Sequence, residues 1–179
     1  MSEFYTMKIA GVERKLEMFP VSDKLDIAAF ILFGDVEITE KSSEELLKKV
    51  PEFDVIVTPE AKSIPLAYEI SKQSGKPYVV ARKGVKVYMK NPLEITVNSI
   101  TTQKEQHLYL GENEVEKIKG KKVLIVDDVI STGESLKSVQ ELVKLAGGIE
   151  VATAAILAEG DAANRDDIIF LEKLPLFFK

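Results

Sequence analysis

The sequence contains no cysteine and only one histidine, His107. Without thiols the chain forms neither a disulfide framework nor a thiolate metal site. One histidine cannot supply a cluster of histidine metal ligands. We therefore expect His107 to have a structural role, and we expect the chemistry to depend on carboxylates, hydroxyls and basic side chains.

Long apolar runs and an excess of basic charge are also missing. The N-terminal residues show no secretory signal, and no stretch has the length of a membrane span. The formal net charge is −5, which argues against nucleic acid as a partner because general binding usually needs a basic patch. We expect a cytoplasmic protein without a membrane partner, whose 179 residues form a single domain.

The most informative stretch is Val123–Ser135, with the sequence VLIVDDVISTGES. Its four leading apolar residues, three of them β-branched, predict a strand that is buried on both faces of a parallel sheet. Asp127 and Asp128 follow where that strand is expected to end. An amphipathic helical pattern begins directly after the loop, with its apolar face at Leu136, Val139, Leu142, Val143 and Ala146.

This order of strand, loop and helix suits a phosphorylated sugar. Unpaired N–H groups at a helix start favour a phosphate, and Ser131, Thr132 and Ser135 would add hydroxyl donors. Two adjacent carboxylates repel each other unless sugar hydroxyls or a divalent cation offset them. The alternative is an ordinary strand with two solvated aspartates and a capped helix. A P-loop is excluded because no Gly-Lys-Ser/Thr follows the strand.

Further strand and helix patterns alternate along the chain. Strands are predicted at Phe53–Thr58, Pro77–Arg82 and Val151–Leu157, and a helix at Ile64–Ser71 that ends at Gly75. Together with the strand at Val123–Val126, this alternation predicts an α/β fold with a mostly parallel sheet between helices. Ligands bind such sheets at the carboxyl ends of the strands.

The remaining segments give weaker signals. A hairpin is expected within residues 1–20 around Gly11, and a capping-box pattern predicts a short helix at Ser43–Lys49. The apolar run Ile27–Phe33 fits either a buried helix or a strand. Residues 84–113 predict an antiparallel excursion with a mobile tip, which would act as a lid or form a plain surface hairpin. A polar loop is expected at 159–167.

The stretch Val123–Ser135 resembles the ribose-5-phosphate-binding motif of the type I phosphoribosyltransferases, in which four hydrophobic residues and two acids precede a Thr-Gly loop. The resemblance implies that fold over residues 1–179, as one domain. About 1–50 and 158–179 would form a variable hood over the base, and about 84–113 a flexible lid hairpin. A homodimer is expected from the family.

The resemblance also implies site residues. The ribose 5-phosphate would be bound by Val129, Ile130, Ser131, Thr132, Gly133, Glu134 and Ser135. The diphosphate would be bound by Glu60, Ala61, Lys62 and Ser63 with Arg82, Lys83 and Lys86. Asp127, Asp128 and Lys104 would be catalytic, and the two aspartates would help to organise Mg²⁺ carried by the diphosphate. From the residues alone, the Glu60–Ser63 loop is either an anion site at a helix start or a simple capping turn.

Three positions depart from the family pattern. Lys62 replaces an expected arginine and cannot make a bidentate contact, and Gln103 replaces a glycine before Lys104. Ser131 stands where hypoxanthine-guanine enzymes have an aspartate that takes the proton of the purine. The resemblance therefore implies a purine salvage enzyme that joins phosphoribosyl diphosphate (PRPP) to a base, with adenine favoured. The alternatives are a xanthine/hypoxanthine enzyme, a non-catalytic PRPP sensor and, more weakly, an orotate or pyrimidine enzyme.

Overall fold

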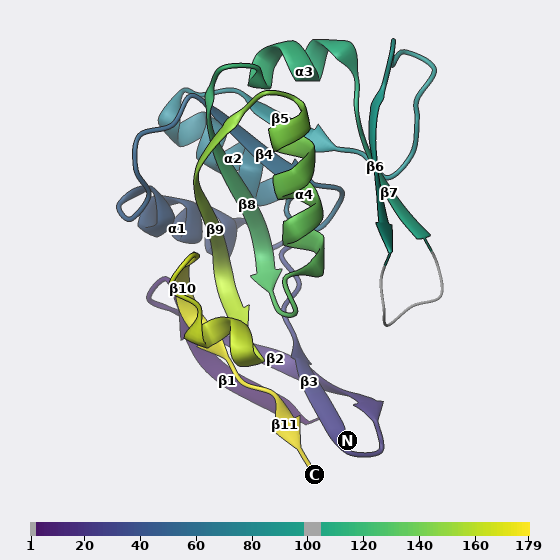
Figure 1. The fold of residues 1–179 in the computed structure, drawn as a ribbon. Coiled ribbons are helices and arrows are strands. Elements are labelled where there is room, and N and C mark those ends of the chain that lie inside the picture. Colours follow the sequence, from purple (N-terminus) through teal and green to yellow (C-terminus); the bar gives the residue numbers. More distant parts are fainter. Residues whose placement is uncertain (1–2, 99–104) are drawn as a thin grey trace.

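The centre of the molecule is a parallel sheet of five strands in the order β10-β9-β8-β4-β5. The computed structural model describes residues 3–98 and 105–179. The strands are β4 (Val55–Pro59), β5 (Tyr78–Ala81), β8 (Lys122–Ile130), β9 (Ile149–Glu159) and β10 (Ile169–Leu174). Helices α1 (Val36–Leu47) and α2 (Ile64–Ser74) cover one face, and α4 (Glu134–Leu145) covers the other (Figure 1). This confirms the predicted α/β architecture.

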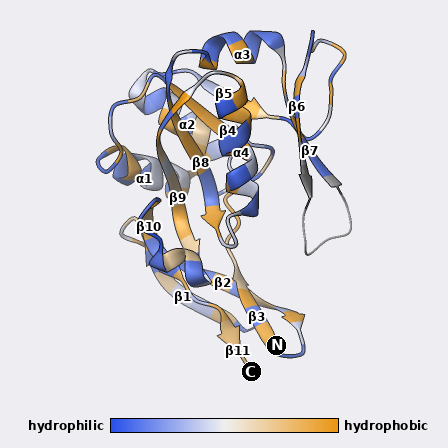
Figure 2. Cartoon of the chain, in the orientation of Figure 1, coloured by the Kyte–Doolittle hydropathy of each residue, from blue (hydrophilic) through white to orange (hydrophobic). Residues whose placement is uncertain are grey.

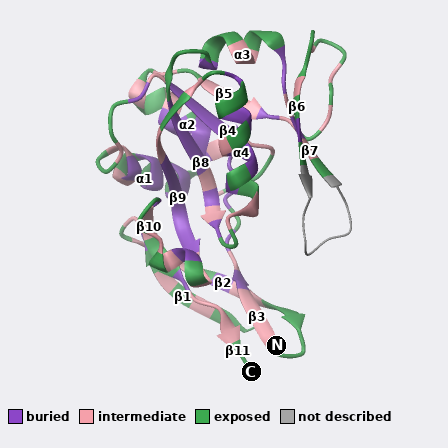
Figure 3. Cartoon of the chain, in the orientation of Figure 1, coloured by how far each residue is buried: buried purple, intermediate pink, exposed green. Residues whose placement is uncertain are grey.

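The sheet is held by apolar side chains on both faces. The four residues Val123–Val126 of β8 are each at most 1% exposed, as expected for a strand between two layers of helices. Figure 2 shows β4, β8 and β9 as largely apolar, and Figure 3 shows the same strands as largely buried. None of the described helices is long and apolar enough to cross a membrane.

A second sheet lies beyond the carboxyl ends of β8 and β9 (Figure 1). It contains β1 (Phe4–Ile9), β2 (Val12–Ser22), β3 (Leu25–Ala29) and the short β11 (Phe177–Phe178), all antiparallel to their neighbours. The predicted hairpin at Gly11 is confirmed, and the first part of the apolar run that began at Ile27 belongs to β3. The rings of Tyr5 and Phe177 meet edge to face with centroids 5.1 Å apart, which joins the two ends of the chain. We refer to this sheet as the hood sheet.

The predicted excursion is an antiparallel hairpin of β6 (Leu93–Asn98) and β7 (Glu105–Leu110). It lies beside α4 in Figure 1 and packs against it through Ile95 and Leu108. Residues 99–104, and with them the candidate Lys104, lie outside the described residues. The helix α3 (Glu112–Ile118) was not predicted, and a short 3₁₀ helix, η1 (Gly160–Asn164), lies within the expected polar loop.

The predicted start of the first helix is wrong by seven residues. The capping pattern placed it at Ser43, but α1 begins at Val36 with Asp35 as its N-cap, and the Ile38 N–H donates to Asp35 Oδ1 at 3.1 Å. Ser42 and Ser43 are buried inside the helix, where the Ser43 hydroxyl donates to the Thr39 carbonyl at 2.7 Å. The helix therefore begins after Asp35, an N-cap that also binds a residue far away in sequence, and not at the local capping-box pattern around Ser43.

That partner is Arg14 of β2, which fixes the hood sheet to α1. Its Nε and Nη2 donate to the two Asp35 carboxylate oxygens at 2.7 and 2.9 Å, and Nη2 also donates to Glu37 at 2.8 Å. The Arg14 guanidinium holds the pKa of Asp35 below its ordinary value. Asp35 therefore serves as a helix cap and as the anchor of a hood strand.

We predict that Asp35→Ala lowers the free energy of unfolding by about 1–2 kcal/mol, because it removes the cap and the bidentate pair. Asp35→Asn should cost less, since an amide oxygen still caps the helix. Because the folded pKa of Asp35 is depressed, its contribution is complete above the ordinary pKa and is lost as the pH falls through the folded value. Urea unfolding at neutral and acidic pH measures both effects. Glu37→Gln is the control, since Glu37 is 62% exposed and should matter little.

Candidate functional site

The two aspartates lie inside β8, and the prediction that they follow the strand is corrected. The ladder to β9 continues past them, pairing Asp127 with Ala155 and Ile130 with Ala158. Asp128 is 5% exposed, and its N–H donates to Asp127 Oδ1 at 2.9 Å. The strand thus holds both carboxylates at fixed positions close to the carboxyl edge of the sheet.

Within the part of the chain that the structure describes, neither carboxylate forms an ion pair with a cation. Burial, followed by the neighbouring Asp128 carboxyl, raises the pKa of Asp127 to about 8. The Asp128 N–H and the Ser63 hydroxyl act in the opposite direction but do not cancel the effect. Burial and the neighbouring carboxyl therefore favour the protonated form of Asp127 more than in a solvated aspartate.

A cavity of about 340 Å³ opens next to this pair. The β4–α2 loop contributes Glu60, Ala61, Lys62 and Ser63, and the chain after β5 contributes Lys83. The third side comes from the β8–α4 segment with Asp127, Asp128, Val129, Ser131 and Ser135. Three segments far apart in sequence therefore meet at the carboxyl ends of adjacent parallel strands, as the sequence predicts.

A smaller recess of about 50 Å³, which we call the loop recess, lies within the β8–α4 loop itself. Ile130, Ser131, Thr132 and Gly133 line it, together with Asp127 and the start of α4. Gly133 has φ of 83° and occupies the N-cap position of the helix, a backbone conformation that favours glycine. The loop recess has the size of a compact anion beside the unpaired N–H groups of a helix start.

Glu60 fixes the loop on the opposite side of the cavity. Its carboxylate accepts from the Lys83 N–H at 2.9 Å and from Arg82 Nε at 3.2 Å, and these contacts lower the pKa of Glu60. Arg82 also donates through Nη1 to the Tyr88 hydroxyl at 3.0 Å. The Glu60–Ala61 peptide bond is cis. Glu60 and Arg82 thus connect the β4–α2 loop to β5 and place Lys62 and Lys83 at the cavity.

Not every predicted site residue lines these two spaces. Arg82, Lys86 and Glu134 are absent from both linings, although each follows or flanks a lining segment. Sequence reasoning also missed several residues. Gln106 and Leu108 of β7 line the cavity. Glu159, at the end of β9, is partly buried, and burial raises its pKa while Lys62 lowers it. Glu159 could have been found, since it ends the strand next to β8.

His107 packs within the hairpin. Its Nδ1 lies 2.7 Å from Glu94 Oε1, and its ring stacks on Tyr109 with centroids 6.1 Å apart. It is absent from the lining of the cavity. These contacts agree with the structural role expected for the single histidine.

The described residues contain no group of three or more His, Cys, Asp or Glu side chains placed to hold a metal ion. Magnesium, however, is usually bound through one or two carboxylates together with phosphate groups of a ligand and water. Asp127 and Asp128 fit that arrangement, because their oxygens are hard donors beside a cavity that has room for a ligand. The donor set suits Mg²⁺ that arrives with a ligand and not a permanent metal site.

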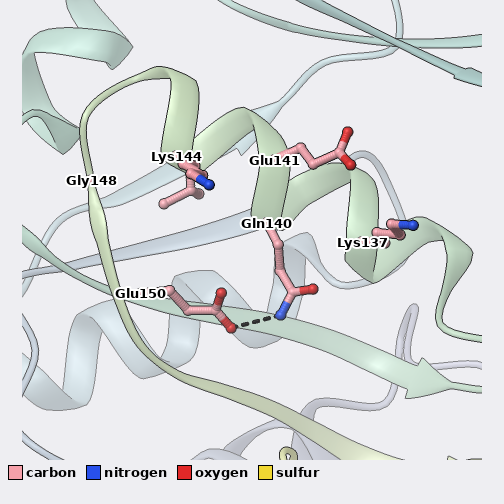
Figure 4. A pocket seen from close by; sticks show the side chains of 7 residues that line it. Lys137, Gln140, Glu141, Lys144, Gly148 and Glu150 are labelled. Atoms are coloured by element: carbon pink, nitrogen blue, oxygen red, sulfur yellow. Dashed lines mark hydrogen bonds between the residues drawn. The ribbon is translucent and has the colours of Figure 1, made fainter.

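Another hollow, shown in Figure 4, lies elsewhere on the molecule. It is lined by α4 and the start of β9, and Gln140 Nε2 donates there to Glu150 Oε1 at 2.8 Å. Glu150 belongs to the amino-terminal part of β9, whereas the cavity lies at the carboxyl ends of the strands. We therefore do not assign this hollow to the candidate site.

Comparisons with known proteins agree with this geometry. The model of the phosphoribosyl transferase domain matches residues 35–174. The hypoxanthine/guanine phosphoribosyltransferase of Methanocella paludicola is 32% identical over 161 residues, which cover 87% of this chain and 78% of the relative. The adenine phosphoribosyltransferase of Thermotoga maritima is 39% identical over 108 residues, covering 60% and 59%. A crystal structure of the adenine enzyme of Thermoanaerobacter pseudethanolicus gives a TM-score of 0.66 at 25% identity, covering 78% and 82%.

We predict that Asp127→Asn stabilises the protein at slightly alkaline pH. An acid whose folded pKa lies above its unfolded value reduces stability as the pH rises from the unfolded to the folded value. The amide removes that loss, so the gain should be roughly 1 kcal/mol or more at pH near 8.5, or about 2–4 °C in Tm. The gain should vanish near pH 4.

Thermal unfolding of wild type and variant across this pH range measures the effect. The exposed Asp161→Asn variant is the control and should show no such pH-dependent difference. A Tm difference for Asp127→Asn that is the same at both ends of the range would contradict the assignment.

Proposed function

The chain belongs to the phosphoribosyl transferase family, and we propose that it transfers the 5-phosphoribosyl group of PRPP to adenine and releases diphosphate. Its relatives make it a purine phosphoribosyltransferase, an enzyme of purine salvage. The observation that carries the proposal is the position of Asp127, which lines the loop recess and also the cavity that Asp128, Lys62 and Lys83 line.

In the proposed complex each part of PRPP meets a separate part of the site. The 5-phosphate would occupy the loop recess, where Ser131, Thr132 and Ser135 offer hydroxyls next to backbone N–H groups. The ribose hydroxyls would donate to Asp127 and Asp128. The diphosphate would lie toward Lys62 and Lys83 of the cavity lining. Arg82 would hold the β4–α2 loop in place through its hydrogen bond to Glu60.

The reaction breaks the bond from C1 of the ribose to the diphosphate oxygen and forms a bond from C1 to a nitrogen of the base. Positive charge develops on the sugar ring, and buried carboxylates nearby stabilise it. Negative charge develops on the departing diphosphate, and Lys62 and Lys83 stabilise it. Bound Mg²⁺ would neutralise part of the diphosphate charge. We include Lys104, from the segment outside the described residues, as a further cation that the lid would supply.

The identity of the purine base is the more specific part of the proposal. Adenine is favoured by the adenine enzymes among the relatives and structural neighbours, and by Ser131 in place of the aspartate expected in hypoxanthine-guanine enzymes. Hypoxanthine is the second candidate, because the relative from Methanocella paludicola matches a larger share of the chain. The hood sheet, at the carboxyl edge of the central sheet, would cover the base. We extend the proposal to a cytoplasmic homodimer.

We predict that PRPP, Mg²⁺ and adenine yield a nucleoside monophosphate and diphosphate when incubated with the protein. Hypoxanthine, guanine and xanthine, tested in parallel, should give lower kcat/KM values. Product formation is followed by chromatography of the nucleotides. Faster turnover of hypoxanthine or guanine would replace adenine with the second candidate, and no nucleotide from any base would overturn the proposed reaction.

We predict that Asp128→Asn lowers kcat by about 100-fold or more while the protein stays folded. The substitution keeps the size of the side chain and removes the carboxyl group next to Asp127, so the fold should not suffer. Initial rates with saturating PRPP and adenine measure the effect, and thermal unfolding verifies the fold. The exposed Asp161→Asn variant should keep wild-type rates. Unchanged turnover of Asp128→Asn would exclude the role assigned to this carboxylate.

A further inference from the structure

Arg165 lies against the β8–α4 loop, although neither sequence reasoning nor the linings of the two spaces include it. The residue follows η1, which turns the chain back from the end of β9. A Cβ atom placed on Gly133 would come within 2.5 Å of Arg165 Nη1 and 3.7 Å of its Cζ. The guanidinium is therefore in direct contact with the backbone of Gly133, at the first turn of α4.

Asp167 fixes the orientation of this guanidinium. Arg165 Nε donates to Asp167 Oδ1 at 2.8 Å and Nη2 to Oδ2 at 2.7 Å, a bidentate pair that uses one edge of the planar group. Nη1, the nitrogen closest to Gly133, makes no hydrogen bond within the described part of the chain. A cation that Asp167 orients, with the N–H donors of Nη1 unused within the described residues, therefore lies beside the loop.

The loop recess next to it contains no positive charge of its own. None of its eight lining residues is basic, and one of them is Asp127. A phosphate monoester carries between one and two negative charges at neutral pH. Neutral hydroxyls and N–H groups would have to balance this charge alone if no cation stood beside the recess. Arg165 is a cation in contact with one of the lining residues, Gly133.

We propose that Arg165 is a further substrate-binding residue, which donates through Nη1 to the 5-phosphate of PRPP. The inference rests on the proposed function, because it names a residue for the phosphate of that substrate. It does not rest on the helix start alone, since it depends on the contact with Gly133, the unused donors and the fixation by Asp167. Arginine suits this task because its planar fork binds Asp167 with one edge and leaves the other for a phosphate.

Two simple ligands separate the subsites. Ribose 5-phosphate carries the 5-phosphate without a diphosphate, and inorganic diphosphate with Mg²⁺ carries the opposite part of PRPP. Isothermal titration of Arg165→Gln should show ribose 5-phosphate binding weakened by about ten- to a hundredfold, the loss expected for one charged hydrogen bond. Diphosphate binding should be unchanged. In steady state, KM for PRPP should rise while KM for the base should not.

Matched variants make the result specific. Lys62→Gln should give the opposite pattern, with weaker diphosphate binding and unchanged ribose 5-phosphate binding. Arg165→Lys should recover part of the lost affinity, because it restores the charge without the fork. Asp167→Asn keeps the guanidinium but loosens its hold, and it should produce a smaller loss for ribose 5-phosphate alone.

The outcomes distinguish the inference from the function on which it rests. If wild type binds both ligands and Arg165→Gln binds ribose 5-phosphate equally well, the role of Arg165 is wrong and the proposed function stands. If Arg165→Gln weakens both ligands alike and lowers Tm, Arg165 only holds the structure together. If wild type binds neither ligand, the proposed function fails and the inference fails with it.

Discussion

The placement of two adjacent carboxyl groups, Asp127 and Asp128, on an otherwise buried strand is the constraint on which the rest of the site depends. Within the described residues neither Asp127 nor Asp128 forms an ion pair with a cation, and burial together with the Asp128 carboxyl raises the pKa of Asp127. Their environment is therefore suited to a ligand that brings hydroxyls, a metal ion or a developing positive charge. A group whose charged form is disfavoured in the fold gains from a ligand that stabilises that form.

The parallel sheet is the means by which this site is assembled. Its strands all end at one edge, so the loops after β4, β5 and β8 meet there although they are distant in sequence. The lysines stand on one side of the aspartates and the loop recess on the other. The hood sheet lies next to this edge (Figure 1), and the β6–β7 hairpin lines the cavity there through Gln106 and Leu108.

Local sequence patterns were sufficient to predict the elements whose structure depends on nearby residues. The buried run before Asp127, the helix that ends at Gly75 and the hairpin at Gly11 were all predictable from the sequence. The start of α1 was not predictable, because the N-cap Asp35 is held by Arg14, which lies on the hood sheet and is distant in sequence. The contact of Arg165 with Gly133 arises only after η1 has folded back, so no spacing in the sequence signals it. The roles of individual site residues likewise depend on ligand positions that a sequence pattern does not contain.

The short strand β11 has a consequence for how such an enzyme changes over time. It pairs with β3, so the hood sheet is built from the first thirty residues and the last few, while the family model spans residues 35–174 between them. Under the proposed function, the sugar-phosphate site and the cover over the base would thus be encoded in separate parts of the gene. Mutations near either end would then alter base preference without disturbing catalysis, and related enzymes would diversify fastest at their two extremities.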